Sequence, residues 1–168
     1  MVRIVRQRAS GNGSKARPML REYPLDQLHR VLAEHRAWLD SDGQSGKKAD
    51  LSYAQLQGLS LWSADLREAD LSYANLKGAN LDHARLRGAS LRHAKMGTTS
   101  LWQANLRDAD LSRADLRSAK LDHADLSGAN LAKADLTGAS LWGAQLSGAH
   151  LEHAMGITDE QLKNAHVA

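Results

Sequence analysis

Within residues 49–153, three acidic residues are each followed directly by a histidine, and such pairs are the residue types found in metal sites and in general acid–base catalysis. The pairs are Asp82-His83, Asp122-His123 and Glu152-His153. The chain has no cysteine, which excludes thiol catalysis, disulfides and cysteine-ligated zinc. It also carries no phosphate-binding glycine motif, nucleophile elbow or HExxH motif. Whether the three pairs can act together depends on the elements that hold them.

A five-residue repeat holds all three pairs and runs without interruption through residues 49–153. Each unit has a small residue, a polar residue, a leucine and two variable residues, as in the Ala-Asn-Leu-Arg-Asp of residues 104–108. Position three is leucine in 20 of 21 units and Met96 in the other, while position one is alanine except at Leu59 and Thr99. A period of five fits neither a helix nor a simple strand, so the sequence predicts a repeat architecture.

Within one unit, positions one and three lie two residues apart and therefore point to the same side of an extended segment. This places alanine and leucine inside, leaves the polar residue outside, and lets the two variable residues turn a corner. A unit this short cannot bury its own leucine, so units must stack coil on coil as in a solenoid.

Outward residues indicate how many units make one coil. Tyr53 and Tyr73 recur four units apart, as do Arg67, Arg87 and Arg107, and Trp62, Trp102 and Trp142 recur eight units apart. Both spacings are multiples of four units, which predicts four short sides per coil. The 21 units then make about five coils, stacked about 4.8 Å apart.

Runs such as the Ala-Asp-Leu-Ser-Arg-Ala-Asp-Leu of residues 109–116 resemble the pentapeptide-repeat proteins. The resemblance implies an all-β solenoid, a right-handed quadrilateral parallel β-helix, with interior ladders of leucine and small residues. The best-known members of that family bind DNA gyrase or topoisomerase IV by resembling B-form DNA. Family analogy also implies a homodimer through the C-terminal end.

Outside the repeat, the sequence predicts three segments. Residues 1–22 form a disordered basic tail, with a transit peptide as the alternative, because the stretch as far as Leu20 holds five basic side chains and no acid. Residues 23–48 hold an amphipathic helix from Leu25 to about Leu39 and a linker, and this helix caps the first coil or binds a partner. Residues 154–168 form a short helix that covers the last coil or joins a dimer interface. We expect a capping box of Thr158 and Gln161 at its start and an end near Ala165.

The acid–histidine pairs do not form a catalytic site in this architecture. His83 and His123 are two coils apart, about 9.6 Å, which is too far to share one metal ion. A convex rod without loops also offers no concave pocket for a small ligand. The sequence therefore predicts no enzyme activity, no metal and no cofactor, and it places these residues at solvated corners.

A recognition surface is the better hypothesis. Trp62, Trp102 and Trp142 lie in line on one face, and Arg67, Arg87 and Arg107 lie on the next. Tryptophan and arginine are enriched at interface hot spots, so we expect these six residues to contact an unidentified protein partner. In the alternative interpretation, the tryptophan rings pack over neighbouring side chains.

Charge separates the remaining function classes. Residues 1–48 hold ten basic and five acidic side chains, whereas residues 49–153 hold 11 basic and 12 acidic ones. A nearly neutral rod without phenylalanine disfavours DNA mimicry and gyrase binding, and it allows weak nucleic-acid binding through the arginines, tryptophans and tail. No apolar run is long enough to span a membrane. We therefore expect a cytoplasmic, non-enzymatic scaffold or protein–protein interaction module.

One irregularity interrupts the interior ladder, because Met96 and Thr99 replace a leucine and an alanine in adjacent units. An inward threonine needs a hydrogen-bond partner. A small kink or a wider interior is expected there.

Overall fold

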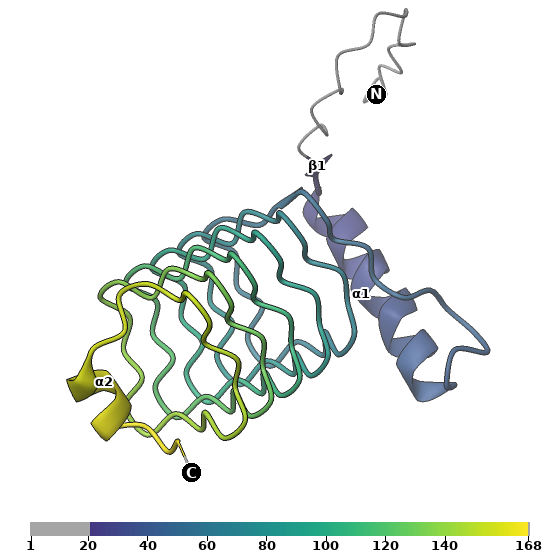
Figure 1. Cartoon of the computed structure of the whole chain (residues 1–168). Helices are drawn as coiled ribbons and strands as arrows, with labels where there is room; N and C mark the ends of the chain where they lie inside the picture. The colour runs from purple at the N-terminus through teal and green to yellow at the C-terminus, as the bar shows by residue number, and fades with distance from the viewer. Residues whose placement is uncertain (1–20, 168) are drawn as a thin grey trace, which may run out of the picture.

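The computed structural model describes residues 21–167, and Figure 1 shows a stack of coils with a long helix across one end and a short helix at the other. Its elements are β1 (Arg21–Glu22), α1 (Leu25–Asp40), β2 (Ala54–Gln55) and α2 (Asp159–Lys163). Most of the expected basic tail, residues 1–20, lies outside the described residues. Its last two residues correct that prediction, because Arg21 and Glu22 form β1 and pair in parallel with β2.

Single-residue bridges join the coils. Each bridge within the repeat links position-two residues that are four units apart and parallel, such as Asn75 with Lys95 and Lys95 with Asp115. The Leu76 N–H donates to the Lys95 carbonyl at 2.8 Å, and the Lys95 N–H donates to the Ala74 carbonyl at 2.8 Å. Backbone hydrogen bonds thus hold each unit to the unit four places before it and to the one four places after it. Outside β2, the regular strand of a unit is shortened to one bridged residue.

The interior contains the leucine and alanine ladders that the repeat predicts. Leu106, Ala94 and Met96 are examples of interior residues with no exposed surface. The Thr99 hydroxyl is also buried and donates to the Leu76 carbonyl at 2.8 Å, which confirms the expected partner. A kink or a wider interior was expected at this unit, but its backbone hydrogen bonds continue without interruption. The Met96 N–H donates to the Asp115 carbonyl at 2.7 Å, and the bridges stay in register.

Position five forms the corner of each unit. Every position-five residue of the repeat has a positive φ, between 54° at Ser63 and 70° at Gly138. This left-handed conformation is unstrained for glycine but costs other residues about 1–2 kcal/mol each. Glycine occupies only some of the corners, so the ladder bonds and the buried interior must stabilise the rest.

Helix α1 packs across the first coil (Figure 1). Leu28 is buried in the same cluster as the interior leucines. The Tyr23 hydroxyl donates to the Asp50 carbonyl at 2.9 Å, and the Ala49 N–H donates to His35 Nδ1 at 3.1 Å. The helix ends at Asp40, one residue later than predicted.

Helix α2 begins with the predicted capping box. The Gln161 N–H donates to Thr158 Oγ1 at 3.2 Å, and the Thr158 N–H donates to Gln161 Oε1 at 2.7 Å. The Gln161 amide also donates to the Ala139 carbonyl at 2.6 Å, which ties α2 to the last coils. The helix ends at Lys163 rather than near Ala165, because the chain then extends and His166 bridges to Gln145 in parallel.

Candidate interaction surface

The three tryptophans of the repeat, Trp62, Trp102 and Trp142, are exposed at position four of their units, and we call them the tryptophan row. Their exposed fractions are 61%, 41% and 59%. Position-four residues that lie eight units apart are separated by two coils, or about 9.6 Å. These large aromatic side chains lie on the outside of a repeat whose leucine and alanine ladders are buried, and they provide apolar contact area at the surface.

Two histidines pack against this row, in line with the alternative interpretation that the tryptophan rings contact neighbouring side chains, although the sequence did not identify these partners. The His83 ring lies edge-on to Trp62 and Trp102, with ring centroids 5.9 and 4.8 Å apart. The His123 ring lies edge-on to Trp142 at 4.6 Å. The three paired histidines lie at corners as predicted, and His123 and His153 are exposed, whereas His83 is partly buried against the row. These contacts arise because a side chain at position five points toward the position-four side chain of a neighbouring coil, a relationship that sequence reasoning did not consider.

The acidic residues between the tryptophans accept hydrogen bonds from the next coil. Asp82 accepts hydrogen bonds from the Ser100 hydroxyl at 2.6 Å and from the Trp102 N–H at 3.0 Å. Asp122 accepts a hydrogen bond from the Ser140 hydroxyl. These carboxylates are therefore used within the solenoid. In the part of the chain that the structure describes, no three histidine, aspartate or glutamate side chains come together as a metal site would require.

Each member of the arginine row, which we define as Arg67, Arg87 and Arg107, lies beside a carboxylate. Arg67 makes a two-pronged contact with Asp65, with both nitrogen–oxygen distances at 2.8 Å. Arg87 and Arg107 pair with carboxylates at 3.3 Å, those of Asp108 and Asp125. The charges of the row are thus compensated locally, while the side chains remain half exposed. This favours contact through shape and hydrogen bonding over a strong positive field.

A second aromatic group lies at another corner. The Tyr53, Tyr73 and His93 rings stack face to face, with centroid separations of 4.8 and 4.7 Å. Burial lowers the pKa of His93, and the nearby charges of Arg113 and Arg92 lower it further. The recurrence of tyrosine four units apart was the sequence signal for this stack.

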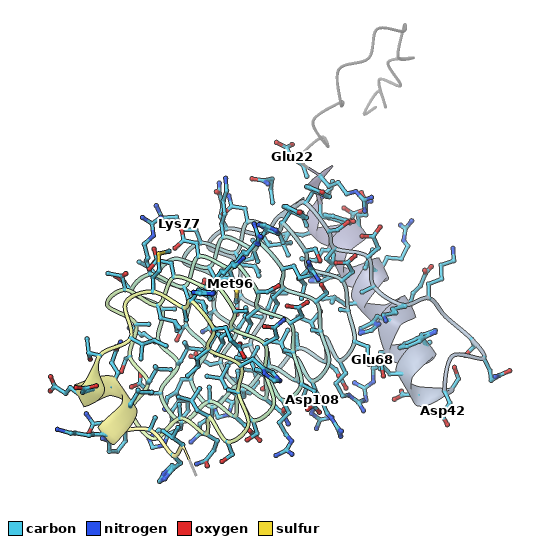
Figure 2. All side chains as sticks on the ribbon, viewed as in Figure 1. Glu22, Asp42, Glu68, Lys77, Met96 and Asp108 are labelled. Carbon is cyan, nitrogen blue, oxygen red and sulfur yellow. The ribbon has the colours of Figure 1, made fainter. Side chains whose placement is uncertain are left out.

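The surface is not uniformly convex, which corrects the expectation that it has no concave site. A groove of about 710 Å³ runs between α1 and the first coils, and Arg36, Arg67, His83 and Arg85 are among its lining residues. It reaches the tryptophan row through His83. In Figure 2, Lys77 and Asp108 project from opposite sides of the solenoid, and a second hollow surrounds the Lys77 side. Sequence reasoning missed the groove because it depends on how α1 docks.

Among the described residues, no helix is long and apolar enough to cross a membrane.

Known proteins resemble the chain over the repeat region. The family model described as pentapeptide repeats matches in eight copies, within residues 49–88, 84–122 and 114–152. A sequence comparison with curated proteins gives no match. Among solved structures, the chain resembles HetL, a pentapeptide repeat protein involved in heterocyst differentiation regulation from the cyanobacterium Nostoc sp. strain PCC 7120. The two are 32% identical, with a TM-score of 0.54, and the match covers 67% of this chain and 59% of HetL.

Two further solved structures are similar over a comparable length. A pentapeptide repeat protein from the thylakoid lumen of Arabidopsis thaliana is 31% identical over 63% of this chain and 73% of that protein, with a TM-score of 0.44. Full-length QnrB1, a plasmid-mediated fluoroquinolone resistance protein, is 19% identical over 73% of this chain and 72% of its own, with a TM-score of 0.30.

The family matches together cover residues 49–152 without a gap in a chain of 168 residues, and they coincide with the bridged coils. The chain therefore belongs to the pentapeptide-repeat family, and its solenoid is a right-handed β-helix.

Proposed function

We propose that this chain is a non-enzymatic, rigid interaction module that holds a protein partner against the tryptophan row. The observation that carries the proposal is the exposure of Trp62, Trp102 and Trp142 on one face, above a completely buried leucine interior. Large aromatic side chains supply much of the binding energy at protein interfaces because they bury a large area with little loss of rotamer freedom.

The surroundings of the row fit such a contact. His83 packs edge-on against two of the tryptophans, and in this proposal the contact orders their rings before a partner binds. A surface ordered before binding loses less side-chain entropy when a partner arrives. On the adjacent face, Arg67, Arg87 and Arg107 each have a carboxylate neighbour and still expose donor groups at the rim. The row and this rim together form the contact surface that we propose.

The ends of the solenoid serve to close it. Leu28 of α1 is buried among the interior residues at one end, and Ile157 and Leu162 pack against them at the other. In this proposal, residues 23–48 and 154–168 are caps for the five-coil β-helix of residues 49–153. Covering the apolar interior and the edge strands protects a solenoid from end-to-end association.

Affinity capture from the native cell tests the contact surface. The bait is the full chain, compared with a variant in which Trp62, Trp102 and Trp142 are replaced by alanine. A matched control replaces Tyr53, Tyr73 and His93, the aromatic stack at another corner. We expect the tryptophan variant to lose the partner and the control to retain it.

Two results would contradict this proposal. Retention of every captured protein by the tryptophan variant would remove the row from the interface. Inhibition of purified gyrase supercoiling at micromolar concentrations of the chain would instead favour the DNA-mimicking class, for which the charge of this rod is unsuited.

A further inference from the structure

The irregular unit around Met96 creates a hollow on the face that adjoins the tryptophan row on the side opposite the arginine row. Gly97 is the single glycine at position four among the 21 units of the repeat. It therefore leaves a gap between Lys77, one coil before it, and Arg117, one coil after it. The hollow has a volume of about 860 Å³, and Lys95 and Asp115 also line it.

The floor of this hollow carries a backbone donor without an acceptor. In neighbouring units of this face, the position-two side chain accepts a hydrogen bond from the position-four N–H. Arg117 donates to Asp115 at 3.2 Å in this way, and Thr137 donates to Asp135 at 3.0 Å. In the unit of Gly97, position two is Lys95, which has no acceptor atom. Among residues 21–167, no atom accepts a hydrogen bond from the Gly97 N–H.

Elsewhere in this solenoid, a carboxylate from outside the unit fills the same role. Position two before Trp102 is Ser100, and its hydroxyl is itself a donor to Asp82. The Trp102 N–H instead donates to Asp82 of the preceding coil at 3.0 Å. The position-four N–H can thus donate to a carboxylate oxygen that its own unit does not supply. Gly97 has no side chain of its own, and the nearest side-chain atoms to an added Cβ are the Asp115 carboxylate oxygens at 4.0 Å, so the anion can come from solvent.

The charges around the hollow favour a ligand with more than one negative charge. Lys77 and Lys95 form no ion pair with any residue that the structure describes. Asp115 is already engaged, because Arg117 Nε and Nη2 donate to its two oxygens at 2.8 and 2.7 Å. Two unpaired ammonium groups therefore flank one free N–H. These groups are donors, and a phosphate has several acceptor oxygens and enough charge to engage all three.

We propose that the Gly97 hollow is a binding site for a phosphate oxyanion. One phosphate oxygen takes the place of the missing position-two carboxylate on the Gly97 N–H, and the Lys77 and Lys95 ammonium groups bind the others. The phosphate is either free in solution or carried on a phosphorylated side chain. This site goes beyond the proposed protein contact and uses none of its residues.

Amide proton–nitrogen NMR spectra of the full chain provide the direct test. Inorganic phosphate and O-phosphoserine are titrated separately, with glutamate as a carboxylate reference. We expect a saturable shift of the Gly97 amide with at least one phosphate probe in the millimolar range or below. The probe that binds more tightly identifies the source of the phosphate. An unmoved Gly97 amide, or an equal response to glutamate, would overturn the proposal.

Two variants distinguish this site from general attraction of anions. Lys95→Asp supplies the missing carboxylate, and Gly97→Gln fills the hollow, where an added Cβ meets no atom closer than 3.6 Å. The matched control is Lys120→Asp, which changes the other position-two lysine of the repeat, next to Asp122 on a different face. We expect both hollow variants to lower phosphate affinity about tenfold or more, a loss of about 1.4 kcal/mol, and the control to lower it little. Equal losses in Lys95→Asp and Lys120→Asp, with phosphate affinity unchanged in Gly97→Gln, would attribute the binding to net charge alone and refute the site.

Discussion

The His83 ring meets Trp102 edge-on at a centroid distance of 4.8 Å, although the two residues lie in successive coils. An edge-to-face aromatic contact contributes about 0.5–1.5 kcal/mol beyond buried area. We therefore expect His83→Ala to lower the free energy of unfolding by about 1 kcal/mol or less and to make tryptophan fluorescence more accessible to acrylamide. His153→Ala is the control, because His153 also occupies a corner and has no ring contact among the described residues. Unchanged quenching in His83→Ala would show that the contact does not order the row.

Leu106 tests the interior ladder, because its side chain has no exposed surface. Truncating a buried leucine removes its transfer free energy and leaves a cavity, which together cost about 2–5 kcal/mol. We expect Leu106→Ala to lower the free energy of unfolding by that amount in urea denaturation. Leu25→Ala is the control, since Leu25 is 60% exposed and its loss should change stability by about 0.5 kcal/mol or less. A parent-like denaturation curve for Leu106→Ala would contradict the buried ladder.

The interior and the length of a coil could be predicted because they follow from the repeat itself. A period of five places positions one and three inside, and the recurrence of Arg67, Arg87 and Arg107 every four units matches the spacing of every bridge between repeat units. The capping box of Thr158 was equally predictable, because it depends on residues three apart. Each of these predictions needs only local geometry or strict periodicity.

The surface could not be predicted in the same way. The contact of His83 with Trp102 depends on the left-handed corner, φ 58° at His83, which directs the side chain toward the next coil. The pairing of Arg87 with Asp108 depends on long side chains that choose among several carboxylates. The groove beside Arg36 exists only because α1 docks against the first coil. Tertiary arrangement decides all three features, and the spacing of residues does not encode it.

Two glycines of the repeat separate conformational strain from steric crowding. Gly148 has a φ of +69° and no atom within 4 Å of an added Cβ, whereas Gly97 also has room but no positive φ. We expect Gly148→Ala to cost about 1–2 kcal/mol, because a Cβ strains the left-handed conformation. Gly97→Ala should be neutral or slightly stabilising, since alanine restricts the unfolded chain. Thermal unfolding of the two variants measures the difference, and equal melting temperatures would contradict the strain at the corners.

His35 couples the packing of α1 to pH. Its side chain is buried, and its Nδ1 must be unprotonated to accept the Ala49 N–H. Burial lowers its pKa, the charges of Lys48 and Arg67 lower it further, and Asp65 and the Arg67 carbonyl oppose the shift. The unfolded chain therefore binds a proton more readily than the folded one. The contribution of this imidazole to folding stability is fully present above the unfolded pKa of about 6.5, and it falls as pH drops from there toward the lower folded pKa.

We expect His35→Asn, whose side-chain oxygen can still accept the Ala49 N–H, to flatten this dependence in urea denaturation between pH 7.5 and about pH 5. His93 remains in both proteins, so the difference between them isolates His35. Parallel pH profiles for parent and variant would show that α1 docks independently of this imidazole.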